Sequence, residues 1–188
     1  MQANIAIIVI VVIVVILVLA FVGMYNGLVA MRNKCEEAFS TMDVCMKKRF
    51  DLIPNLVETV KGYAAHERGT LNEVTQARSM IQSAGNNQEQ RMQGENMLTN
   101  TLRSLFAVAE NYPDLKANVN FMQLQNELTA LEDEIGQSRK YYNAVVRDYN
   151  TKCETVPSNI IANMFHFTRK PSYELPNEAE REAPKVQF

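Results

Sequence analysis

An uninterrupted apolar run near the start of the chain constrains its fold more than any other feature. The run extends from Ile5 to Val22 and reads IAIIVIVVIVVILVLAFV, without a charge, a proline or a hydrogen-bonding side chain. A helix rises about 1.5 Å per residue, so with Gly23 to Tyr25 this run spans roughly the 30 Å of a bilayer's hydrocarbon core. We therefore expect residues 1–24 to form an N-terminal transmembrane anchor in contact with membrane lipid.

The flanks of the apolar run favour a retained anchor over a cleaved secretory signal. A signal needs basic residues before its apolar core and small residues at a cleavage site after it. This chain instead starts MQAN, and GMYN follows the run. Arg32 and Lys34 lie after the run, and basic residues close to a span tend to stay in the cytoplasm. We expect a single-pass protein with a short N-terminus outside and its C-terminal domain in the cytoplasm.

The rest of the chain has the periodicity of long helices. Apolar residues recur every three or four positions, with few glycines or prolines inside the periodic segments. One helix is predicted to continue from the span to about Phe50, and three more to cover about 51–82, 88–111 and 118–155. The first boundary is placed at Pro54, because proline is tolerated in the first turn of a helix.

Long helices with short connections favour an antiparallel up-down arrangement. The predicted fold is therefore all-α, an N-terminal transmembrane helix continuing into a long antiparallel four-helix bundle. The bundle is expected over residues 25–156, in the cytoplasm.

Residues 157–188 should follow the bundle. In an up-down bundle the fourth helix returns toward the membrane, so this segment is expected to begin near it. Its apolar stretch, from Ile160 to Phe167, is followed by Arg169 and Lys170. The stretch could lie in the lipid headgroup layer, pack on its own bundle, or pack on a neighbouring copy. The last twenty residues hold three prolines and balanced charges, which predicts an extended or disordered tail.

Two features indicate self-association as a homo-oligomer. A G-x-x-x-G spacing at the inner end of the span allows two helices to approach closely. Apolar side chains are also left over in the segment after the bundle. Together these give the candidate interaction residues: Gly23, Gly27, Ile160, Ile161, Met164, Phe165 and Phe167.

Motifs for catalysis or metal binding are missing from the sequence. His66 and His166 belong to no metal-binding pattern, and the cysteines lack zinc spacing. A formal net charge of −2 gives no broad basic face for nucleic acid. We predict a protein that is not an enzyme, with no cofactor, no metal and no nucleic-acid partner.

Four charged residues lie on or beside apolar helix faces in the first half of the chain. They form either a buried polar cluster or ordinary solvated flanks, and burial would require pairing. In both cases a structural role is expected of them: Asp43, Glu58, Lys61 and Arg78.

Three blocks of sequence resemble the LemA family. The first is YNGLV from Tyr25, continued by RFDLIPNLVETVKGYAAHE from Arg49. The second is AENYPDLKA from Ala109, and the third is YNAVVRDYN from Tyr142. The resemblance implies a bacterial cytoplasmic (inner) membrane protein with an N-terminal anchor and a helical bundle, and it implies no catalytic residues. Family members are associated with membrane zinc proteases, which makes such a protease a candidate partner.

The sequence therefore predicts a non-enzymatic, membrane-anchored scaffold or interaction protein that self-associates at the membrane. The alternative is an adaptor or regulator of another membrane protein, such as a membrane zinc protease. In the first case the protein's stoichiometric partner is a second copy, and in the second case it is a different chain.

Overall fold

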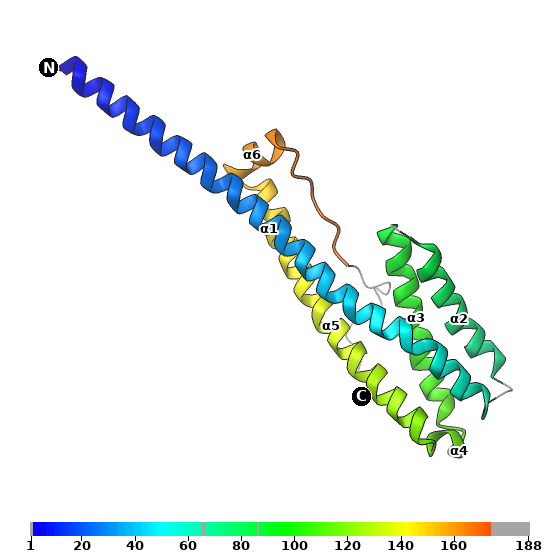
Figure 1. Cartoon of the computed structure of the whole chain (residues 1–188). Coiled ribbons are helices and arrows are strands. Elements are labelled where there is room, and N and C mark those ends of the chain that lie inside the picture. Colours follow the sequence, from blue (N-terminus) through cyan, green and yellow to red (C-terminus); the bar gives the residue numbers. More distant parts are fainter. Residues whose placement is uncertain (1, 65–66, 86, 174–188) are drawn as a thin grey trace, which may run out of the picture. The chain divides into compact units, whose positions relative to one another are not determined.

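The protein is built from helices joined by short turns. A computed structural model describes residues 2–64, 67–85 and 87–173, and these ranges contain no strand. The elements are α1 (Gln2–Lys61), α2 (Arg68–Ser83), α3 (Gln88–Ala109), α4 (Pro113–Lys116), α5 (Val119–Glu154) and α6 (Ser158–Met164) (Figure 1). The predicted all-α class and the long apolar N-terminal helix are confirmed. The predictions for His66 and for the tail from residue 174 lie outside the described residues.

The chain divides into two compact units. The first unit comprises residues 1–41 and 140–172, and the second comprises residues 42–139 and 173–188. Helices α1 and α5 each contribute residues to both units.

Helix α1 continues through Pro54, where the sequence predicted the start of a new helix. A proline inside a helix lacks one backbone N–H and crowds the carbonyl four residues earlier, which costs about 3 kcal/mol or more. The helix persists because Ile53, Leu56 and Val60 are buried in the core of the second unit. Each buried side chain of this kind contributes about 1.5–3 kcal/mol, so three of them outweigh that cost. The predicted second helix is therefore divided between the end of α1 and α2.

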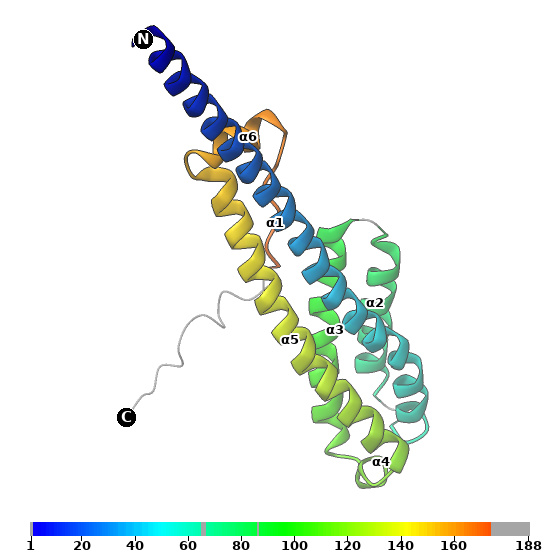
Figure 2. The ribbon, with the colours of Figure 1, turned by 60° about the vertical axis from the view of Figure 1, so that its left-hand side comes forward.

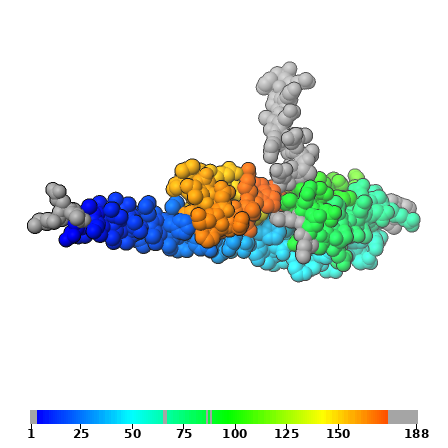
Figure 3. All heavy atoms as spheres, turned by 90° about the horizontal axis from the view of Figure 1, so that it is seen from above, coloured from blue at the N-terminus to red at the C-terminus, as the bar shows by residue number. Residues whose placement is uncertain are grey.

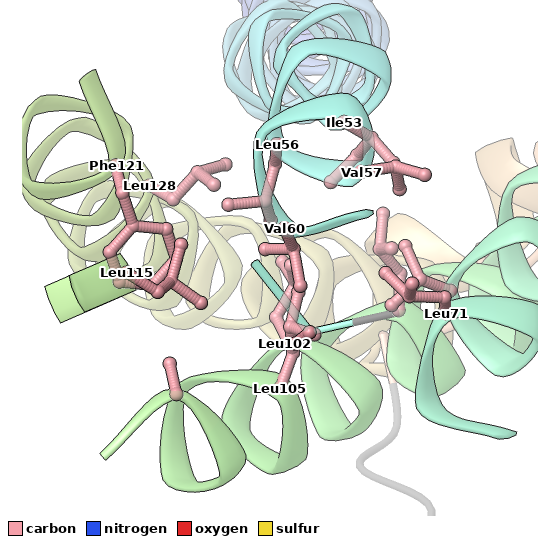
Figure 4. Packing of buried hydrophobic residues seen from close by; sticks show 14 of the residues in the cluster. Ile53, Leu56, Val57, Val60, Leu71, Leu102, Leu105, Leu115, Phe121 and Leu128 are labelled. Carbon is pink, nitrogen blue, oxygen red and sulfur yellow. The ribbon is translucent and has the colours of Figure 1, made fainter. Parts of the chain in front are cut away.

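The core of the second unit draws side chains from four long helices and from the short α4. In Figure 4, Leu56 and Val60 of α1 point toward Leu102 and Leu105 of α3. The remaining members of the cluster come from α1, α2, α3, α4 and α5 and from the turn after α1, which contributes Ala64: Ile53, Val57, Ala64, Leu71, Val74, Ala77, Leu98, Ala109, Leu115, Phe121 and Leu128. Four helical segments around one apolar cluster are consistent with the predicted four-helix bundle.

In the first unit, α1 and α5 run antiparallel. The ring of Phe39 packs on that of Tyr142 with centroids 5.7 Å apart. Earlier along α1, the Cys35 thiol donates a hydrogen bond to the carbonyl of Val145 at 3.7 Å. Earlier residues of α1 thus face later residues of α5. The end of α5 therefore lies beside the part of α1 that follows the apolar run (Figure 2).

All three cysteines are free and buried. Burial raises the pKa of the thiols of Cys35 and Cys45, which keeps them protonated near neutral pH. These residues therefore serve as small apolar packing groups.

Replacement of Pro54 by alanine tests how the core holds α1 together. Pro54→Ala restores a backbone N–H at a position that is already helical, which removes the penalty of about 3 kcal/mol. The unfolded chain becomes more flexible without proline, which offsets up to about 1 kcal/mol of this gain. The free energy of unfolding should therefore rise by about 2 kcal/mol. Urea unfolding of the full chain in mild detergent, followed by helical circular dichroism, measures it. The neighbouring Asn55→Ala should change the value by less than about 0.7 kcal/mol. A destabilised Pro54→Ala protein would show that α1 is broken at this position.

Candidate membrane-proximal site

The side chains of the apolar run are exposed along its whole length. Large side chains in Ile5–Val22 are between 36% and 67% exposed, and the first part of α1 extends beyond the other helices (Figure 1). The helix satisfies its own backbone hydrogen bonds, which is the condition for crossing hydrocarbon. It is long and apolar enough to cross a bilayer. These exposed side chains are therefore stable only in an apolar environment, which the described chain does not provide.

An aromatic cluster forms where the apolar run ends. Phe165 packs against Phe21 with ring centroids 6.0 Å apart, and against Tyr25 with centroids 4.8 Å apart. Phe167 contacts Tyr25 edge-on at 5.9 Å, and the guanidinium of Arg32 lies 5.3 Å from the Phe167 ring centroid. The cluster attaches the segment after α5 to the C-terminal end of the run, and Figure 3 shows this segment lying against α1.

Helix α6 has one buried face and one exposed face. Ile161 and Ala162 are at most 2% exposed, because they pack within the first unit. Ile160 and Met164 lie one turn apart on the other side and are 59% and 58% exposed, while Phe165 is 44% exposed. Of the residues predicted to mediate interactions here, Ile161 and Phe167 are buried within the chain, and the other three are accessible.

The chain reverses direction after α6. His166 has a positive φ of 57°, and the N–H of Phe167 donates to the carbonyl of Ala162 at 2.8 Å. This is a Schellman ending, with a left-handed residue directly after the helix. It turns the following residues back along α5.

The returning segment, residues 168–172, is held along α5 by hydrogen bonds to its backbone. Asn150 donates from its side chain to the carbonyl of Lys170 and accepts from the N–H of the same residue, both at 2.9 Å. The hydroxyls of Tyr149 and Tyr142 donate to the carbonyls of Thr168 and Pro171, both at 3.0 Å. This packing was not predictable from the residue pattern, because the segment is extended and has no periodicity.

The two glycines of the G-x-x-x-G pattern have different surroundings. A side chain added at Gly23 would meet no atom within 4 Å. A Cβ on Gly27 would lie 2.6 Å from the ammonium of Lys152. Gly23 is therefore open to an outside neighbour, whereas Gly27 makes room for a lysine of the same chain.

Charge is distributed unequally between the two units. The first unit holds seven Lys and Arg against four Asp and Glu, a net +3. The second holds twelve against seventeen, a net −5, which together give the −2 of the whole chain. The unit that contains the apolar run is therefore basic, although the overall composition shows a weakly acidic protein.

A buried ionic cluster lies in the second unit, and the sequence analysis missed it. Arg49 is 0% exposed and forms ion pairs with Glu95 of α3 and Glu132 of α5. The hydroxyl of Thr99 accepts a hydrogen bond from Arg49 at 2.7 Å and donates one to Glu132 at 3.1 Å. Burial raises the pKa of the Glu95 carboxyl, and the charge of Arg49 opposes that shift. The cluster joins α1, α3 and α5 around one guanidinium.

The position of Arg49 could have been found from spacing. The buried stripe of α1 passes through Met42, Met46, Arg49 and Ile53, and not through the neighbouring aromatic residue Phe50. Phe50 is instead only partly buried. A charged residue at the helical spacing of the buried apolar residues predicts a buried ion pair, because an unpaired charge is costly to bury.

The four charged residues proposed from the sequence do not form one cluster. Asp43 pairs with Arg91 at a partly exposed site, and Glu58 and Lys61 form an exposed pair at 2.8 Å. The guanidinium of Arg78 lies 4.5 Å from the centroid of the Phe50 ring. Across residues 2–64, 67–85 and 87–173, no three metal-binding side chains come together.

Comparison with known proteins gives consistent matches. A sequence profile of the LemA family matches residues 38–188. The chain is 28% identical over 142 residues to Protein LemA of Metamycoplasma hominis, an alignment that covers 76% of this chain and 65% of that protein. It is 27% identical to magnetosome protein MamQ 2 of Paramagnetospirillum magneticum and 25% identical to MamQ of Magnetospirillum gryphiswaldense, each over 77% of this chain and 62% of the relative. The chain thus spans less than two thirds of the length of these relatives.

Removal of the guanidinium tests the ionic cluster. Arg49→Met leaves Glu95 buried without its cation, so the free energy of unfolding should fall by about 3–5 kcal/mol near neutral pH. A buried carboxyl with a raised pKa contributes stability at low pH that is lost as the pH rises through its folded-state pKa, so the variant should regain stability on acidification. Urea unfolding at about pH 8 and about pH 5 measures both effects.

The double variant Arg49→Met, Glu95→Gln is the control. It removes the uncompensated charge and should recover much of the loss at the higher pH. Equal destabilisation of the single and double variants at both pH values would show that packing, and not charge, is responsible.

Asn150 tests how the returning segment is held. Asn150→Ala removes both side-chain hydrogen bonds to Lys170, which should lower stability by about 1–3 kcal/mol and expose the backbone. Limited trypsin digestion of the full chain should then cleave after Arg169 several-fold faster than in the wild type. Thr151→Ala, an exposed neighbour on the same helix, should leave that rate unchanged. If the two variants were cleaved at the same rate, Asn150 would not be the residue that holds the segment.

Proposed function

The chain belongs to the LemA family, and from this premise we propose that it is a non-enzymatic scaffold that is anchored in the membrane by α1 and self-associates there. The family and the similarity to LemA and MamQ proteins make it a membrane-associated protein. The observation that carries the proposal is the apolar run: it is exposed along its whole length and continues as one helix into a folded helical domain.

The proposed anchor is a single pass through the cytoplasmic membrane of a bacterium, with the folded domain in the cytoplasm. Support for this orientation comes from Arg32 and Lys34, the first basic residues after the run, and from the basic character of the first unit. The three free cysteines agree with a reducing compartment.

The proposed association surface is the face of the span that carries Gly23. Lipid tails give no hydrophobic drive for helix association, so close backbone approach at small residues provides most of the attraction. Gly23 has no atom of its own chain within reach of an added Cβ, which leaves this face free for a second copy.

Mass measurement of the full chain in mild detergent tests self-association. The wild type should be an oligomer of the 21.3 kDa chain over a wide range of concentrations. Gly23→Leu should shift the population toward monomer, because the larger side chain keeps the helices apart. Gly136→Leu is the matched control, since a Cβ at Gly136 also meets nothing within 4 Å, and it should leave the mass unchanged.

A strictly monomeric wild type would contradict the proposal. Recovery of one different protein in stoichiometric amount from membranes, in place of a second copy, would favour the adaptor function and a partner such as a membrane protease.

A further inference from the structure

We propose that the exposed face of α6 and the ammonium of Lys152 together form a docking surface for the headgroup layer of the membrane that α1 crosses, with an anionic phospholipid as the ligand. The inference rests on the proposed anchorage of α1. In this proposal Ile160, Met164 and Phe165 contact lipid and do not contact a second copy of the chain. Self-association would then depend on the transmembrane span alone.

The contact between Phe165 and Phe21 fixes the depth of this surface. Phe21 is the second-last residue of an apolar run about 27 Å long, so it lies at the boundary of the hydrocarbon core when the run crosses a bilayer. The ring centroid of Phe165 is 6.0 Å from that of Phe21 and 4.8 Å from that of Tyr25, one turn further on. Phe165 therefore lies where acyl chains meet headgroups.

The exposed residues of α6 have the chemistry of that boundary. Ile160, Met164 and Phe165 are all exposed apolar side chains at α6, and Val156, which precedes this helix, is 78% exposed. Other residues of α6, Ile161 and Ala162, are buried and already occupy the inward-facing positions. A short amphipathic segment with an accessible apolar face is stabilised when that face enters the interface between headgroups and acyl chains.

Lys152 lies at the level expected for lipid phosphates. Its ammonium is against Gly27, which lies two residues, about 3 Å, beyond Tyr25, where the stretch that matches the hydrocarbon core ends. The headgroup layer extends about 5–8 Å beyond the hydrocarbon core on each side. Among the residues that the structure describes, Lys152 has no carboxylate partner, whereas Arg169 and Lys170 pair with Glu154 and Glu36.

Gly27 leaves room for this placement. A Cβ at residue 27 would lie 2.6 Å from the lysine nitrogen, so a larger residue would displace the flexible end of the Lys152 side chain. The net +3 of the first unit adds a general attraction for an anionic surface. Charge and depth together favour an anionic lipid over a second copy of the same basic unit as the occupant.

The absence of tryptophan from the chain allows a direct measurement of depth. The full-length Phe165→Trp variant is reconstituted in vesicles of phosphatidylcholine and phosphatidylglycerol that contain lipids brominated at shallow or deep acyl positions. We expect strong quenching of its fluorescence, greatest with the shallow bromines. Met164→Trp repeats the measurement without altering the aromatic cluster.

Two variants calibrate this experiment. Phe21→Trp lies in the span and should be quenched. Tyr141→Trp, at a site 51% exposed on α5 and next to the residue that packs on Phe39, should be quenched little. Quenching at Phe21 with none at positions 164 and 165 would overturn the inference while leaving the anchor intact. Loss of quenching at Phe21 as well would mean that the proposed anchorage itself had failed.

A second measurement tests the ligand. Spin-labelled phosphatidylglycerol and phosphatidylcholine report the protein's relative preference for the two lipids. Lys152→Gln should reduce the preference for phosphatidylglycerol by about fivefold, the effect of one basic residue near the surface. Lys140→Gln, with the same charge change near the far end of the first unit, should leave it unchanged. An unaltered preference in Lys152→Gln, or an equal change in both variants, would contradict the role of Lys152.

Discussion

The rest of the structure depends on eighteen consecutive apolar residues whose large side chains stay exposed along the whole run. At about 25 cal/mol per Å², leaving such a surface in water is costly, and a single helix that satisfies its own backbone can avoid this only in an apolar medium. The consequence reaches beyond the run itself. Because α1 is one helix from Gln2 to Lys61, the residues that follow the apolar run begin the folded domain without a flexible linker.

Two kinds of interaction hold that domain, and they differ between the units. In the second unit, leucines and other apolar residues from α1, α2, α3 and α5 form one core, and Arg49 connects three helices through carboxylates. A buried ion pair adds little net stability, but it restricts which helices can pack together, since any other partner leaves charges unpaired. In the first unit, aromatic rings and backbone hydrogen bonds attach α6 and the returning segment to α1 and α5. This attachment places the exposed face of α6 and the side chain of Lys152 beside the C-terminal end of the apolar run.

The helical class, the apolar helix and the extents of α3 and α5 were predictable, because periodicity reports which side of a helix is buried. The boundary at Pro54 was predicted wrongly, because local propensity was outweighed by the burial of Ile53, Leu56 and Val60, which only the tertiary structure reveals. The return of the chain from α5 to the region of Phe21 followed from counting helices. The sequence did not predict which of residues 160–167 are buried and which are exposed, since this depends on the Schellman turn at His166 and on contacts with distant residues.

Alkaline carbonate extraction of bacterial membranes, combined with the intact mass of the extracted chain, tests the anchor most directly. If α1 crosses the membrane, the protein should stay in the membrane pellet, dissolve only with detergent, and have a mass that includes the apolar run. Release of the protein into the alkaline supernatant, or a mass that lacks the residues before Tyr25, would contradict the account.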